Sequence, residues 1–97
     1  MSGRPESSHL WSTVKIGDNN VEYRYFPGRT RVKAGTAVTF SNARDIPHTA
    51  TSDANPRPFS SPALDTDETF SFVFTTPGDY AYFCAIHPHM RGRIVVK

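Results

Sequence analysis

The chain has 97 residues, a length typical of a single domain, and its 11 basic and 9 acidic side chains leave a formal net charge of +2. This charge is small and no basic run has aromatic residues interleaved with it, so the composition argues against a nucleic-acid partner. No apolar stretch approaches the ~20 residues that cross a bilayer, so we expect no insertion into a membrane. The single cysteine cannot form an internal disulfide, and the cysteine count therefore does not identify the redox compartment.

Short segments separated by turns follow one another along the chain. Residues 1–9 have no apolar centre, and we expect a disordered leader or an artificial start there, followed by a domain over residues 10–97. Within this domain, several segments alternate apolar and polar residues or are rich in β-branched and aromatic residues, which predicts strands. These segments are 10–17, 21–26, 30–35, 36–42, 68–74, 80–84 and 92–97. Residues 43–67 are predicted to be mostly loop, because three prolines follow Ala54 within them.

The pattern as a whole predicts an all-β fold. Seven to eight short strands without helical periodicity favour a β-sandwich, in which each sheet hides its apolar face against the other. Phe70, Phe72 and Phe74 occupy alternate positions of one strand, so their rings are expected on its core side. Trp11 is also expected to contribute to packing.

The segment YFCAIHPHMRG (82–92) concentrates metal-binding chemistry near the end of the chain. Cys84 alone is as readily explained as a small buried hydrophobe. His87 and Met90 follow it at intervals of three residues, and a thiolate, an imidazole and a thioether on one short loop suit copper better than magnesium or calcium. A trigonal site of two histidines and one cysteine with a weak axial methionine is the arrangement of a blue-copper centre.

Such a site needs a second histidine, and the candidates are His9, His48 and His89. His9 lies in the polar leader. His89 is so close to His87 on a short loop that its side chain is expected to point elsewhere, into solvent. His48 follows the predicted strand 36–42 and is favoured, because it can reach the end of the sandwich where the cysteine strand also finishes.

The pieces FPGRTRVKAGTAVTFSN, PHTATS and TTPGDYAYFCAIHPHMRGRIVV resemble the cupredoxins, the small blue-copper proteins, over nearly the whole domain. The Cys-x-x-His-x-x-Met spacing is similar to that of the amicyanin loop. The resemblance implies an eight-stranded Greek-key sandwich with one type 1 copper bound by His48, Cys84, His87 and Met90. It also implies a monomer in the periplasm or another extracytoplasmic compartment, which carries single electrons between redox partner proteins and is not an enzyme.

The resemblance further implies roles around the metal. Asn42 matches the family's asparagine that ties the first-histidine loop to the cysteine loop, although Ala85 stands where amicyanin-like loops often have a hydroxyl residue. His87 is expected to show its ring edge at the surface, within a patch on which redox partners dock transiently. The residues expected to form this patch are Ile46, Pro47, Ile86, Pro88 and His89.

Other interpretations stay open. The chain can be the cupredoxin domain of a larger redox enzyme, or a copper-trafficking protein that hands over ions instead of electrons. Zinc in the same ligands would be a loading artefact. A hydrolase with Cys84 as nucleophile and His87 as base is disfavoured, because no orienting partner and no oxyanion-hole signature accompany the pair.

Overall fold

The structure is a computed structural model that describes residues 10–18 and 21–97, so the predictions for residues 1–9, including His9, lie outside the described residues. The described residues form eight strands and no helix. The strands are β1 (Trp11–Asp18), β2 (Val21–Phe26), β3 (Arg29–Val32), β4 (Thr36–Asn42), β5 (Thr51–Ser52), β6 (Thr69–Phe74), β7 (Gly78–Phe83) and β8 (Arg91–Val96). The all-β prediction is confirmed.

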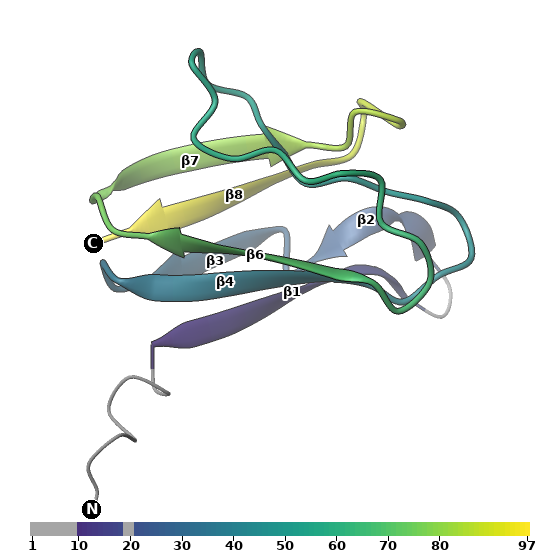
Figure 1. The fold of residues 1–97 in the computed structure, drawn as a ribbon, viewed down its shortest axis with the longest axis horizontal. Helices are drawn as coiled ribbons and strands as arrows, with labels where there is room; N and C mark the ends of the chain where they lie inside the picture. The colour runs from purple at the N-terminus through teal and green to yellow at the C-terminus, as the bar shows by residue number, and fades with distance from the viewer. Residues whose placement is uncertain (1–9, 19–20) are drawn as a thin grey trace, which may run out of the picture.

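The strands form two sheets of four, in the orders β2-β1-β4-β6 and β3-β8-β7-β5. Figure 1 shows β7 and β8 in one layer and β1, β4 and β6 in the other. Strands β1 and β4 run parallel, as do β3 and β8, whereas the other pairs are antiparallel. Neighbours in a sheet are therefore often distant in sequence, as the Greek-key β-sandwich predicted from the sequence requires.

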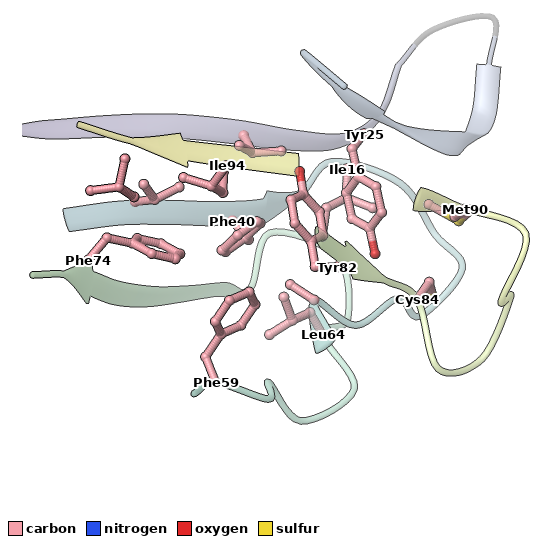
Figure 2. Packing of buried hydrophobic residues seen from close by; sticks show 14 residues of the cluster. Ile16, Tyr25, Phe40, Phe59, Leu64, Phe74, Tyr82, Cys84, Met90 and Ile94 are labelled. Carbon is pink, nitrogen blue, oxygen red and sulfur yellow. The ribbon is translucent and has the colours of Figure 1, made fainter. Parts of the chain in front are cut away.

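Side-chain alternation explains why the sheets face each other. Every second residue of β4 is buried, and Val38 and Phe40 have no exposed surface. On β6, Phe74 is buried while Phe70 and Phe72 are half-buried against the core, so the predicted core side of this strand is confirmed. The buried hydrophobic residues form one cluster that runs along the sandwich (Figure 2).

Three local predictions differ from the structure. β3 ends at Val32, before the turn at Gly35, whose φ of 95° favours glycine. A short strand, β5, lies inside the segment predicted as mostly loop; it is only two residues long and has no alternation to reveal it. Trp11 is 69% exposed, so the expectation that it packs was wrong: it begins a strand, beyond the core.

The connection between β4 and β6 folds back on itself and thereby holds His48 in place. The backbone N–H of His48 donates to the carbonyl of Leu64 at 3.1 Å, and the N–H of Leu64 donates to the carbonyl of His48 at 2.7 Å. A second bridge pairs Thr51 with Ser60. Buried backbone groups in this long connection are thus satisfied without a long strand.

Strands β7 and β8 approach closely where Tyr82 lies opposite Gly92. The Tyr82 ring has no exposed surface, and a Cβ atom at position 92 would overlap the ring and its hydroxyl. Glycine at this position therefore makes room for the ring. These two strands carry the ends of the loop that holds Cys84, His87 and Met90, so their spacing also sets the spacing of the loop ends.

Candidate metal centre

The predicted ligands lie at one end of the sandwich. Cys84 follows the last residue of β7, and Met90 precedes the first residue of β8. Figure 2 shows both side chains at one end of the core cluster, with Phe74 at the other end. The loop between them is closed by two backbone hydrogen bonds, from Cys84 N–H to the Met90 carbonyl at 3.1 Å and from Met90 N–H to the His87 carbonyl at 2.9 Å.

His48 and Cys84 meet in the interior of the molecule. Both have 0% exposure, and His48 Nδ1 lies 3.8 Å from Cys84 Sγ. Taking zinc as a guide, metal–nitrogen and metal–sulfur bonds of about 2.0–2.1 Å and 2.3 Å put the two donor atoms about 3.5–3.8 Å apart at tetrahedral to trigonal angles. The separation of this pair therefore fits two ligands of one metal ion.

The ring of His87 lies next to that of His48, and the Met90 carbonyl accepts the N–H of Cys84. The ring centroids of His87 and His48 are 5.3 Å apart, and Met90 is 2% exposed. Among the described residues, the buried His87 Nε2 has no hydrogen-bond partner, an arrangement that costs free energy unless another group, such as a metal, binds this atom. Within residues 10–18 and 21–97, no three His, Cys, Asp or Glu side chains form a complete metal cluster, so the four-ligand set stays a prediction.

Thr49, which the sequence analysis missed, connects the two ligand segments. Its hydroxyl accepts a hydrogen bond from Ala85 N–H at 2.8 Å, and its own N–H donates to Cys84 Sγ at 3.4 Å. The Thr49 hydroxyl also shares a hydrogen bond with the hydroxyl of Thr51, and its carbonyl accepts one from Tyr25 at 2.5 Å. The only signal in the sequence was a hydroxyl residue directly after the candidate ligand His48.

Asn42 makes different contacts from those expected. Its amide nitrogen donates to the carbonyls of Ile46 and Leu64, at 3.0 and 2.7 Å. Both partners belong to the segment around His48, and among the described residues Asn42 makes no hydrogen bond to the cysteine loop. Asn42 braces the turn that leads to His48, and Thr49 makes the link because its backbone and hydroxyl already lie beside Cys84.

Two buried tyrosines support the site from the core side. Tyr25 and Tyr82 pack edge to face with ring centroids 4.7 Å apart, and both lie between the core and the loop of Cys84 (Figure 2). Burial raises the pKa of both phenols above the ordinary value, and for Tyr25 the neighbouring Cys84 and Tyr82 add to the effect. Only Tyr25 has a partner for its hydroxyl; that of Tyr82 has none among the described residues.

Three of the expected docking residues lie on the loop between Cys84 and Met90, and the other two directly precede His48. Pro47, Ile86, Pro88 and His89 are exposed and Ile46 is half-buried. His89 thus faces solvent, as predicted. His87 is partly exposed, and the ring of Tyr23 lies against it, with centroids 4.7 Å apart.

Tyr23 is the second residue that the sequence analysis missed. Alternation along β2 placed Tyr23 and Tyr25 on the same side of the strand, but not which of them would be buried. In the structure Tyr25 is in the core and Tyr23 is beside the histidines, 42% exposed. Which of the two tyrosines is buried depends on how β2 pairs at the edge of its sheet.

The fold and the site together define a small metal-binding β-sandwich protein with soft and borderline ligands. A buried imidazole and thiol converge at one end, and a second imidazole and a thioether stand on the adjoining loop. The chain belongs to the plastocyanin/azurin family of copper-binding proteins, whose family model matches residues 12–97. Its cofactor is copper, and the resemblance to the cupredoxins is confirmed.

Individual relatives agree with this assignment. The chain is 39% identical to amicyanin-alpha of Methylorubrum extorquens over 70 residues, which cover 69% of this chain and 59% of that protein. It is similar to a purple cupredoxin from Nitrosopumilus maritimus, with a TM-score of 0.79, 32% identity, and coverage of 89% of this chain and 99% of the other. It is also similar to a copper-containing nitrite reductase from Thermus scotoductus SA-01, with a TM-score of 0.79, 33% identity, and coverage of 91% of this chain but 22% of that chain. The described residues contain no helix that could span a membrane.

Proposed function

We propose that the chain carries single electrons between redox partner proteins and that His48, Cys84, His87 and Met90 hold one type 1 copper. The observation that carries this proposal is the buried approach of His48 Nδ1 to Cys84 Sγ at 3.8 Å. Bound copper supplies a one-electron couple between Cu(II) and Cu(I). With four protein ligands, no position is left open for a substrate, which favours electron transfer over catalysis at this site.

Hydrogen bonds within the chain hold the proposed ligands in place. His48 is held by backbone hydrogen bonds to Leu64, and Thr49 links its segment to the segment of Cys84. Ligands fixed in this way need to move little when the charge of the metal changes, so the energy of reorganisation is small. The short N–H contact from Thr49 to Cys84 Sγ withdraws charge from the sulfur and so affects the reduction potential.

Transfer to a partner is proposed to occur through the surface around His87. The exposed docking residues Pro47, Ile86 and Pro88 offer an apolar surface to a partner. Such a surface supports fast and weak association, which suits a monomeric carrier. His89 makes the patch more polar than an apolar residue would. By analogy with its relatives, we place the protein in the periplasm or another extracytoplasmic compartment.

A second candidate function is that of an electron-transfer domain within a larger copper enzyme. The similarity to the nitrite reductase chain supports it, because our chain matches 22% of that chain at 33% identity. In that case the site would pass electrons to a catalytic centre elsewhere in the same protein. The sequence of the full-length gene decides between the two candidates.

The visible spectrum after addition of Cu(II) tests the proposed site. We expect an intense blue or green charge-transfer band that a mild reductant bleaches. Cys84→Ala should abolish the band because the sulfur is its source, whereas the matched control His89→Ala should keep it. A colourless wild-type protein overturns the proposal. Loss of the metal to a chelator during repeated redox cycles would instead favour copper trafficking.

A further inference from the structure

The ring of Tyr23 lies among three histidine rings. Its centroid is 4.7 Å from that of His87, 6.0 Å from that of His48 and 5.9 Å from that of His89. The contacts with His87 and His48 are edge to face, at interplanar angles of 66° and 82°. No other aromatic ring among the described residues contacts both proposed histidine ligands.

The ring of His87 lies against both Tyr23 and His48, and the three ring centroids form a triangle with sides of 4.7, 5.3 and 6.0 Å. Tyr23 is 42% exposed and His87 is partly exposed, so both rings lie nearer the surface than the fully buried His48. His87 Nε2 has no hydrogen-bond partner among the described residues, so ring contacts, and not hydrogen bonds from this atom, restrict how the imidazole turns.

We propose that Tyr23 is a positioning residue for His87: its ring packs edge to face against both His87 and His48 and so holds the His87 imidazole beside His48. This inference rests on the proposed copper site, in which His87 is a ligand. Aromatic pairs of this geometry contribute beyond their buried area, enough to bias a ring orientation by about two- to ten-fold. Tyr23 comes from β2, not from the loop of His87, so the position of the ligand depends on a different part of the chain.

The contact between Tyr23 and His87 should affect how readily the metal is exchanged. A ligand near the surface is the ligand that turns away most easily, because fewer atoms oppose its motion. With Tyr23 in place, His87 loses a ring contact when it turns away from His48. Without Tyr23, solvent and a chelator reach the site more readily.

The test compares Tyr23→Ala with Tyr23→Phe, which keeps the ring, and with Trp11→Ala, which removes another exposed aromatic residue from the same sheet. In the metal-free proteins, NMR measures cross-relaxation between the ring protons of His87 and His48. In the Cu(I)-loaded proteins, the rate of copper transfer to a chelator is measured. We expect Tyr23→Ala to weaken the ring contact and raise the transfer rate about two- to ten-fold, with Tyr23→Phe and Trp11→Ala at wild-type values.

Two results would overturn the inference: an unchanged ring contact and transfer rate in Tyr23→Ala, or equal changes in Trp11→Ala. If Tyr23→Ala does not fold, Tyr23→Leu is judged by the same criteria, because it keeps apolar volume without the ring. The metal-free measurement is independent of the copper site. A wild-type protein that fails to turn blue would therefore refute the proposed function, while the ring contact would still report on Tyr23.

Discussion

The inner and outer sides of the proposed copper site are held by different interactions. On the inner side, His48 and Cys84 are fully buried, and backbone and hydroxyl hydrogen bonds through Thr49 connect their segments. On the outer side, His87 is partly exposed and contacts the rings of Tyr23 and His48. Hydrogen bonds are directional, whereas ring contacts tolerate sliding and rotation.

This difference suggests that the two sides of the site have different roles. The inner side would fix the metal, because losing a buried hydrogen bond is costly and the positions of these groups are therefore well defined. The outer side would meet a partner protein and the solvent, where some freedom is tolerable. Substitutions on the inner side should therefore cost more stability than substitutions on the outer side.

The largest effect is expected for Gly92→Ala, which alters the β7–β8 strand pair that carries the ligand loop. The new methyl group would overlap the buried ring of Tyr82, so the β7–β8 pair must separate or the ring must move. We expect a loss of about 3 kcal/mol in the free energy of unfolding, measured by urea denaturation of the metal-free protein.

Gly28→Ala is the matched control for this substitution. A Cβ at Gly28 would meet only the carbonyl oxygen of Tyr25, at 3.9 Å, which is ordinary contact. We expect a change of less than about 1 kcal/mol. Equal losses in the two variants would show that the close approach of Tyr82 to β8 does not matter for stability.

Next in size is Thr49→Val, which removes the link within the inner side while keeping its shape. The N–H of Ala85 loses its acceptor, and we expect a loss of about 1–2 kcal/mol in the free energy of unfolding. Thr51→Val serves as the comparison, because it removes only the hydroxyl contact to Thr49 and should cost less. If both variants unfold at the same urea concentration, Thr49 is not the link that the geometry indicates.

A smaller effect distinguishes the two buried tyrosines. Tyr25→Phe deprives the Thr49 carbonyl of a donor and should cost about 1 kcal/mol. Tyr82→Phe removes a buried hydroxyl that has no partner in the described part of the chain, and it should leave stability unchanged or slightly higher. Thermal or urea unfolding of the two variants side by side checks the order, and the reverse order would contradict it.

The smallest effect is a loss of stability in alkaline solution. Because the folded pKa values of Tyr25 and Tyr82 are raised, the folded protein keeps both phenol protons while the unfolded chain releases them near pH 10. Their contribution is therefore fully present below pH 10 and is lost as pH rises further, by about 0.4 kcal/mol for each tyrosine at pH 10. Urea unfolding from pH 8 to 10.5 should show a weaker decline in Tyr82→Phe than in the wild type, and equal declines would refute this assignment.

Much of the fold and part of the site could be predicted from local patterns. The β-branched and aromatic residues of 36–42 and the alternation along 68–74 predicted two strands, whose buried hydrophobic residues are Val38, Phe40 and Phe74. The spacing of Cys84, His87 and Met90 placed three candidate ligands on one loop, because residues so close in sequence cannot lie far apart. The composition of that loop also indicated copper through the softness of its donor atoms.

Only the tertiary structure decided how distant segments meet. The approach of His48 to Cys84, which are 36 residues apart, depends on the pairing of the long connection with Leu64 and on the register of two sheets. Long-range pairing also decides that Thr49 links the His48 segment to the cysteine loop and that the ring of Tyr23 packs against His87. Alternation shows which side of a strand faces the core. It does not specify which strand pairs with it or in which register the two strands pair. The sequence by itself therefore determined the strands and the chemistry of the ligand loop, and the long-range pairing decided which side chains support that loop.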